Sequence, residues 1–224
     1  MFGSAVNSFA FVDAEGSVTL VDCGVVKAPP RIVAGLSAIG KTPADVTRIV
    51  LTHVHPDHAG GAAEVARLTG APVLAHRDDV EFAQSGRAPG ADPSLRLGRI
   101  LHRIVAGGKF PAVEIGTPLT DGDLLDVGGG LRVVHTPGHS PGHVSLLHEP
   151  SRVLITGDAI FNVAGIRIAP RMLCSDFRMT EKTAHRLGEL EYDVVAFTHG
   201  PEIRDRAREQ VRGFLSRLQR RTAT

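Results

Sequence analysis

Residues 51–61 read Leu51-Thr52-His53-Val54-His55-Pro56-Asp57-His58-Ala59-Gly60-Gly61. They continue an apolar run at 49–51 that is typical of a buried strand, and they lead into a segment with helical spacing. In an extended chain, residues two apart point to the same side, so His53 and His55 can bind one metal ion. The proline then bends the path and presents Asp57 and His58 toward a second, adjacent position. Packing does not account for this concentration of ligand-type side chains, and the stretch predicts a metal site.

Three further ligand-type side chains occupy the same kind of place, a loop directly after an apolar strand: His139 after 131–136, Asp158 after 152–156 and His199 after 194–198. Loops at strand ends on one edge of a sheet are where α/β folds build their sites. Each position alone is weak evidence, because a single His or Asp after a strand is commonly a cap or a turn residue. Their order along the chain predicts one shared site.

The rest of the chain alternates between strand and helix patterns. Residues 5–22 predict two short strands joined by a turn, and Pro29-Pro30 starts a helix that Gly40 ends. Further strands are predicted at 49–51, 73–75, 123–127, 131–136, 144–148, 152–156 and 194–198, and further helices at 61–69, 181–190 and 203–221. This mixture indicates an α/β protein with helices on the outer faces of its sheets, and the length fits a single domain over residues 1–224.

Residues 80–118 interrupt the alternation. They contain a predicted amphipathic helix with Leu97, Ile100, Leu101, Ile104 and Val105 on one face and Arg96, Arg99, His102 and Arg103 on the other. Two interpretations of this stretch remain open. In the first, it is an inserted lid, whose His102, Arg103, Lys109 and Phe110 would touch substrate. In the second, its helix is an ordinary surface helix.

Charge and composition exclude several classes of function. The 224 residues carry 25 basic and 24 acidic side chains, and the net charge of +1 gives no general attraction to nucleic acid or membrane. The arginines between Arg204 and Arg221 fall mostly off the apolar face of their predicted helix, which indicates a solvated surface. Cys23 and Cys174 form no paired metal or redox motif, and no apolar run is long enough to span a membrane. We expect a cytoplasmic protein with a small-molecule substrate and no nucleic-acid or membrane partner.

Together these motifs resemble the metallo-β-lactamase-fold superfamily of hydrolases, over nearly the whole chain from 18–24 to His199. The resemblance implies an α/β fold that is a four-layer αββα sandwich, in which two mixed β-sheets are flanked by helices. It also implies the ligand sets: His53, His55 and His139 for one ion, Asp57, His58 and His199 for the other, and Asp158 bridging the two. The family usually has Thr at the position of Cys23, and the resemblance implies that Asp22 supports the site without binding metal.

The chemistry implied by the resemblance is that of a binuclear metal-dependent hydrolase. Two divalent ions roughly 3.5–4 Å apart lower the pKa of a shared water from 15.7 toward about 7, so a bridging hydroxide is available at neutral pH. This hydroxide cleaves an ester-type bond while the ions hold the developing negative charge. Asp57 is the expected catalytic residue, because it can hydrogen-bond the hydroxide as well as bind metal. Zinc suits a nitrogen-rich site best, and iron or manganese also fits the mixed His and carboxylate set.

Differences between this sequence and individual branches of the superfamily narrow the range of expected substrates. His55 stands where a flavodiiron centre would have glutamate. Full-length hydroxyacylglutathione hydrolases add a helical region after the last histidine, where only 25 residues follow His199. Acyl-homoserine lactonases have a tyrosine three residues after the bridging aspartate, where this chain has Phe161. Nucleases carry extra RNA-binding segments and generally a basic approach to the site.

We therefore rank a thioester or a small carboxylic ester as the first expected substrate, with a lactone or a phosphodiester as the alternatives. Three residues near the ligands are candidates for lesser roles. His135 and His143 flank His139 and are expected to support it through turn geometry or hydrogen bonds. Asn162, close behind Asp158, is a candidate substrate contact.

Overall fold

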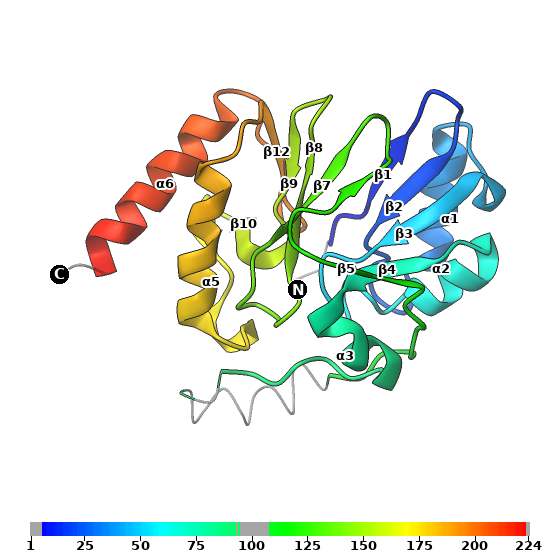
Figure 1. Ribbon diagram of the computed structural model, residues 1–224, viewed down its shortest axis with the longest axis horizontal. Coiled ribbons are helices and arrows are strands. Elements are labelled where there is room, and N and C mark those ends of the chain that lie inside the picture. Colours follow the sequence, from blue (N-terminus) through cyan, green and yellow to red (C-terminus); the bar gives the residue numbers. More distant parts are fainter. Residues whose placement is uncertain (1–5, 93, 95–107, 223–224) are drawn as a thin grey trace.

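The computed structural model describes residues 6–92, 94 and 108–222, and this part of the chain folds into four layers. Two five-stranded sheets stand face to face, and helices cover the outer face of each sheet (Figure 1). The predicted fold class, an α/β four-layer αββα sandwich of two mixed sheets, is confirmed.

The first sheet contains only residues from the N-terminal part of the chain, up to Leu119. Its strands, in their order across the sheet, are β1 (Phe9–Val12), β2 (Val18–Val21), β3 (Val46–Val50), β4 (Val73–His76) and β5 (Thr117–Leu119). β1 and β2 form the predicted antiparallel hairpin, and the other neighbours run parallel. Its connections include α1 (Pro29–Ala38), η1 (Pro43–Asp45), α2 (Ala62–Thr69), η2 (Arg77–Asp79) and α3 (Val80–Ser85).

The second sheet contains only residues from the second half. Its strands are β6 (Leu124–Leu125), β7 (Leu131–His135), β8 (Val144–His148), β9 (Val153–Ile155) and β12 (Val194–Ala196). They lie in the order β12-β9-β8-β7-β6, and only the β12–β9 pair is parallel. The other elements of this half are η3 (Gly157–Ala159), β10 (Ile160–Asn162), β11 (Ile166–Ile168), η4 (Arg171–Leu173), α5 (Phe177–Ala184), η5 (His185–Gly188) and α6 (Ala207–Thr222).

Alternation along the strands sorts apolar side chains into three core layers. In β3, Ile49 packs toward the helices of the first half, whereas the next residue, Val50, packs between the two sheets. In β8, Leu146 packs between the sheets and Leu147 packs toward the helices of the second half. Strands buried on both faces explain why the sequence shows continuous apolar runs at these places.

Most of the helices and strands predicted from the sequence are present in the structure, with shifted ends. The predicted helix at 181–190 begins earlier, as α5, because the Asp176 carboxylate accepts a hydrogen bond from the backbone N–H of Met179 and caps the helix at that point. The C-terminal helix buries Ala207, Val211 and Leu215, as its apolar periodicity predicts. β5 and the β10–β11 hairpin were not predicted, because strands of three residues leave little periodicity to detect.

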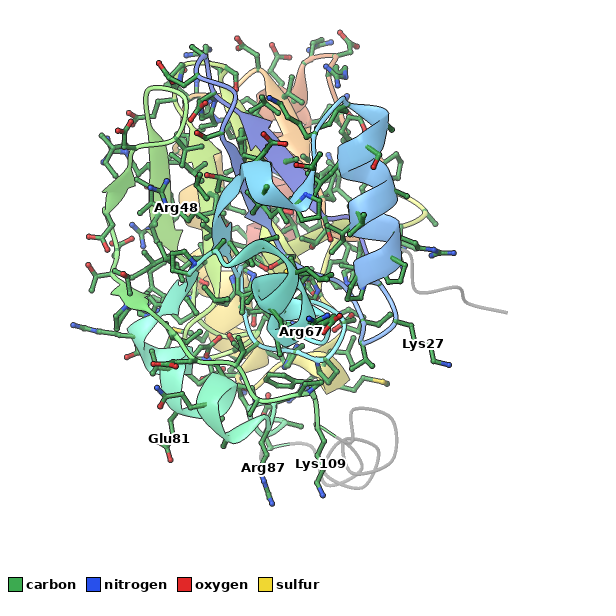
Figure 2. The ribbon with its side chains drawn as sticks, turned by 90° about the vertical axis from the view of Figure 1, so that its right-hand side faces the viewer. Lys27, Arg48, Arg67, Glu81, Arg87 and Lys109 are labelled. Carbon is green, nitrogen blue, oxygen red and sulfur yellow. The ribbon has the colours of Figure 1, made fainter. Side chains whose placement is uncertain are left out.

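Part of the irregular stretch 80–118 belongs to the body of the fold. α3 packs there, β5 pairs with β4, and Phe110 is buried in the core of the first half. Phe110 therefore does not serve as the substrate contact that the lid interpretation gave it, whereas Lys109 projects from the surface near Arg87 (Figure 2). His102 and Arg103 lie outside the described residues, and the lid remains a prediction.

Within the described ranges, none of the helices combines the length and the apolar character that crossing a membrane would require.

Candidate metal centre

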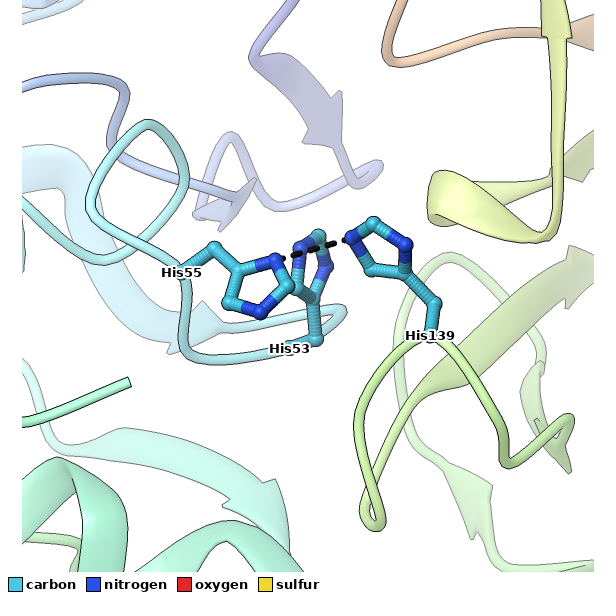
Figure 3. A group of neighbouring side chains, drawn as sticks. All are labelled: His53, His55 and His139. Atoms are coloured by element: carbon cyan, nitrogen blue, oxygen red, sulfur yellow. Dashed lines mark hydrogen bonds between the residues drawn. The ribbon is translucent and has the colours of Figure 1, made fainter. Parts of the chain in front are cut away.

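Loops from both sheets meet at one edge of the sandwich. The loop 51–61 leaves β3, and the loops that carry His139, Asp158 and His199 leave β7, β9 and β12. Figure 3 shows His53 and His55, from the first of these loops, facing His139 from another. The structure thus brings together, from two halves of the chain, the side chains that the sequence predicted to share a site.

The first group is made of three imidazoles, those of His53, His55 and His139, which are all buried. Nδ1 of His55 lies 2.8 Å from Nε2 of His139, the contact drawn as a dashed line in Figure 3. The His53 ring centroid is 4.7 Å from that of His55 and 4.6 Å from that of His139. Three nitrogens this close, and shielded from water, are arranged as ligands of one ion.

The second group contains Asp57, His58 and His199. Oδ2 of Asp57 lies 3.8 Å from Nε2 of His58 and 3.6 Å from Nε2 of His199. The Asp57 side chain is 34% exposed, whereas that of His58 is fully buried. This group is therefore the more open of the two, and Asp57 is the ligand-type side chain at its solvent side.

Asp158 lies between the two groups. Its Oδ2 is 3.2 Å from Nε2 of His139 and 3.3 Å from Nε2 of His199, and its Oδ1 is 3.4 Å from Nε2 of His58. The hydroxyl of Thr198 donates a hydrogen bond to Oδ1 at 2.7 Å and fixes the carboxylate. One buried carboxylate thus faces both groups, as a bridging ligand must.

Two buried nitrogens show that these residues fit divalent metal. Among the described residues, neither Nε2 of His53 nor Nε2 of His58 has a hydrogen-bond partner. Thr52 donates its hydroxyl proton to Asp22, so the same hydroxyl oxygen accepts from Nδ1 of His53 at 3.1 Å and leaves a lone pair on Nε2. Unpartnered imidazole lone pairs that converge on a carboxylate in a buried site are the donor set of a transition-metal centre.

Asp22 supports this centre through hydrogen bonds to Thr52 and His58, as predicted. Its carboxylate accepts hydrogen bonds from the backbone N–H and the hydroxyl of Thr52, each at 2.8 Å, and from Nδ1 of His58 at 2.8 Å. Its φ of 59° lies in the left-handed region, which Asp tolerates better than most residues. These hydrogen bonds all go to neighbours of the site, so Asp22 orients a candidate ligand without being one.

The electrostatics of the cluster favour bound positive charge. Burial alone would raise the pKa of Asp158, but His58 and His139 hold that pKa well below its usual range. Burial alone would lower the pKa of His58 and of His139, but Asp158 raises the first well above its usual range and the second to about 9. Either protons or metal ions supply the positive charge that this carboxylate attracts, and a metal ion replaces the protons when it binds.

His143 and His135, the two histidines flanking His139, have different places. Nε2 of His143 accepts a hydrogen bond from the backbone N–H of Asp158 at 2.7 Å, and its Nδ1 contacts the carbonyl of Thr136 at 3.0 Å. Burial, together with His139, lowers the pKa of His143 to about 3, so its ring is neutral and can accept that bond. The His135 ring stacks on that of His76, outside the two groups, and its Nε2 donates to the carbonyl of Pro141 in the His139 loop at 2.9 Å.

Sequence patterns did not single out Asp79, which holds the His139 loop. Its carboxylate accepts hydrogen bonds from the Ser140 hydroxyl at 2.7 Å and from the Gly142 N–H at 2.8 Å. Burial raises the pKa of Asp79 to about 6. Only the fold brings η2 against this loop, so no local signal could have found the contact.

Asn162, the candidate substrate contact, and Phe161, which stands where lactonases have a tyrosine, both contact the His199 segment. The Asn162 amide donates to the Pro201 carbonyl at 2.8 Å, and the Asn162 backbone N–H donates to the His199 carbonyl at 2.9 Å. Asn162 therefore braces the last ligand loop, and this amide proton is not directed at a substrate. The Phe161 ring centroid lies 4.4 Å from that of His199 and forms an apolar wall.

Comparisons with known proteins agree with this geometry. The family model described as "Metallo-beta-lactamase superfamily" matches residues 2–199. The chain is similar to a probable metallo-hydrolase YybB of Bacillus subtilis (strain 168), with 28% identity over 86% of this chain and 80% of the relative. It is similar to an N-acyl homoserine lactonase of Bacillus cereus, with 30% identity over 77% of this chain and 63% of the relative.

A hydroxyacylglutathione hydrolase of Rhodopseudomonas palustris (strain BisB18) is 24% identical over 80% of this chain and 65% of the relative. The chain thus spans slightly less than two thirds of the lactonase and of this hydrolase. Among solved structures, a metallo-beta-lactamase family protein from Thermus thermophilus superposes with a TM-score of 0.72 at 27% identity, over 96% of this chain and 75% of that one. The chain therefore belongs to the metallo-beta-lactamase superfamily and is one of its metal-dependent hydrolases.

Proposed function

We propose that this protein is a two-metal hydrolase that cleaves an ester-type bond in a small molecule, with thioesters and small carboxylic esters as the first substrate class. The observation that carries the proposal is the position of Asp158, whose carboxylate contacts side chains of both groups. A site for one ion would not need the second group of ligand-type side chains, Asp57, His58 and His199.

The chain's own residues define how two ions would be held. His53, His55 and His139 would bind one ion, Asp57, His58 and His199 the other, and Asp158 both. When bound, the ions would lower the pKa of a water to near neutrality and polarise the substrate carbonyl. Five imidazoles favour zinc, and the two carboxylates make iron or manganese acceptable.

Asp57 is proposed as the catalytic residue. It is the most exposed of the seven side chains, and its Oδ2 lies 3.6 Å from Nε2 of His199, at the open side of the site. A carboxylate there can hold a proton on the oxygen that does not bind the ion and pass it to the leaving group. The Cys174 thiol is buried against His139 and the carbonyls of Ala169 and Pro170, so it is not placed to attack a substrate. Direct hydrolysis is therefore favoured over a covalent intermediate on this thiol.

The ranking of substrates rests on the wall beside His199. Phe161 offers an apolar surface and no hydroxyl, which suits an acyl group that needs no further hydrogen bond. The likeness to a hydroxyacylglutathione hydrolase supports a thioester. The 30% identity to a lactonase makes a lactone the second candidate, although the chain spans 63% of that relative.

The proposal is tested by measuring metal content and hydrolysis on the same preparation. The substrate panel contains an acyl thioester, a p-nitrophenyl ester, an acyl-homoserine lactone, a β-lactam and bis-p-nitrophenyl phosphate. We expect at least two ions per chain and the fastest turnover on the thioester or the simple ester.

The double variant His53→Ala/His55→Ala should lose metal and activity, and His185→Gln, which changes a histidine outside the ligand groups described above, should lose neither. Unchanged metal content and activity in the double variant would refute the metal centre. Turnover of bis-p-nitrophenyl phosphate far above all acyl substrates would instead overturn the substrate class and leave the metal centre standing.

A further inference from the structure

A second cluster of ligand-type side chains lies outside the candidate metal centre. It consists of His76, Asp78 and His135. His76 is the last residue of β4 in the first sheet, and His135 is the last residue of β7 in the second sheet. The cluster therefore joins the two halves of the fold, as the candidate centre does, but through different strands.

The cluster brings ligand-type atoms of three side chains close together, although its two imidazole rings do not yet face one point. The rings of His76 and His135 are stacked, with centroids 3.8 Å apart and planes inclined by 15°. Nδ1 of His76 lies 3.6 Å from Oδ2 of Asp78. Two ligand atoms at 2.0–2.1 Å from a tetrahedral zinc stand roughly 3.3 Å apart. One ligand atom from each residue lies within 4.8 Å of the others, so one ion could bind all three once one imidazole rotates out of the stack.

Other contacts orient these side chains, and one of them would have to give way to an ion. Nε2 of His135 lies 2.9 Å from the Pro141 carbonyl and donates to it, which leaves its Nδ1 with a lone pair. The backbone N–H of Asp78 donates to Nδ1 of His76 at 3.3 Å, a long bond that an ion would displace at little cost. Arg77 lies 3.7 Å from the other oxygen of Asp78, Oδ1.

Access and chemistry also suit an ion. The side chain of Asp78 is 46% exposed, whereas that of His76 is almost fully buried, so the cluster opens to solvent on the carboxylate side. Two imidazoles and one carboxylate select transition metals over calcium or magnesium, which prefer all-oxygen sites. The half-open arrangement leaves a coordination position for water.

We propose that His76, Asp78 and His135 form an auxiliary site for a third divalent transition-metal ion such as zinc. The ion would pin the end of β4 to the end of β7. The residue after Asp78 is Asp79, which holds Ser140 and Gly142 of the His139 loop. An ion in the auxiliary site would thus stiffen the loop that carries a candidate ligand of the main centre. This proposal does not depend on the proposed hydrolytic function.

The test counts ions per chain in protein equilibrated against a series of buffered free zinc concentrations, by elemental mass spectrometry, with the melting temperature measured in parallel. Wild type should bind one more ion than either Asp78→Asn or His135→Gln, and its melting temperature should rise further at high free zinc. Removal of one ligand should weaken the binding of the third ion at least about tenfold, because loss of a residue that only hydrogen-bonds a ligand already has an effect of this size. His185→Gln, a matched change outside the cluster, should bind as wild type does.

Equal ion counts in wild type, Asp78→Asn and His135→Gln at every zinc concentration would overturn the auxiliary site. The double variant His53→Ala/His55→Ala separates this outcome from failure of the main centre. It should keep the ion that His135→Gln loses, and loss of that ion in the double variant would also count against an independent site. Asp78→Asn changes a largely exposed side chain, so its ion count does not depend on rebuilding a buried core.

Discussion

The carboxylate of Asp22 accepts a hydrogen bond from Nδ1 of His58 at 2.8 Å, and both side chains are completely buried. This bond fixes which nitrogen of the imidazole carries the proton and turns the Nε2 lone pair toward Asp158. Such outer partners raise the basicity of a ligand and hold its orientation.

We expect Asp22→Asn to weaken metal binding by about 10- to 100-fold, because asparagine keeps the shape and the backbone conformation but not the charge. Competition with a chromophoric chelator measures the affinity. Asp193→Asn is the matched control, since Asp193 is exposed and pairs with Arg152 away from the cluster. An unchanged affinity in Asp22→Asn would show that the bond to His58 has no influence on the metal.

A glycine beside a candidate ligand gives a second prediction. Gly138 has a φ of +132°, and a Cβ there would lie 2.2 Å from the backbone nitrogen of Thr180. We expect Gly138→Ala to cost about 3–5 kcal/mol of unfolding free energy and to lower metal content, because the adjacent His139 must move. Gly165→Ala has a comparable φ of +100° but open space around it. It should cost only about 1–2 kcal/mol. Urea denaturation compares the two, and equal costs would contradict the steric account.

The apolar wall beside His199 gives a third prediction. Phe161→Tyr adds a hydroxyl at the position where acyl-homoserine lactonases have a tyrosine. We expect the ratio of kcat/KM for a lactone to kcat/KM for a thioester to rise about 2- to 10-fold, the value of one added hydrogen bond. Phe214→Tyr, on α6 away from the site, should leave the ratio unchanged. A ratio that falls in Phe161→Tyr would argue against a role for this wall in selecting substrate.

Acid sensitivity gives a fourth prediction. The pKa of His143 is about 3 in the folded chain, because of burial, and 6.5 in the unfolded chain. The unfolded state therefore binds more protons between these values. The stabilising contribution of neutral His143 is complete above pH 6.5 and is lost as the pH falls toward 3, at up to about 1.4 kcal/mol per pH unit.

His143→Gln can still accept from the Asp158 N–H and donate to Thr136, but it does not titrate. Its unfolding free energy, measured by urea denaturation of metal-loaded protein, should fall less steeply than that of wild type below pH 6.5. Parallel slopes for the two proteins would contradict the pKa assigned to His143.

The candidate ligands could be predicted from the sequence because each of them lies near the end of a strand. His53, His55, Asp57 and His58 lie in one loop, and their alternation with the strand period is visible without a structure. The other three follow apolar runs, and the rule that strand ends share an edge was enough to group them. The supporting role of Asp22 came from the family resemblance, since its own neighbourhood in sequence carries no sign of the bond to His58.

Contacts between distant segments could not be predicted in this way. Asp79 reaches Ser140 across 61 positions, and His76 meets His135 through the packing of two sheets. The local hydrophobic pattern of the sequence reveals neither pair, because the partners come together only when the two sheets pack. The contact of the Asn162 amide with Pro201 could not be predicted for the same reason, since the fold sets it and the neighbours in sequence do not.

Each sheet is continuous in the chain, and the turn between β5 and β6 is the boundary between them. The first segment carries four of the seven candidate ligands and the second carries three, so neither fragment alone contains a complete site. A cut in this turn would divide the candidate ligands between two pieces. Assembly of the centre therefore requires that the two sheets pack against each other.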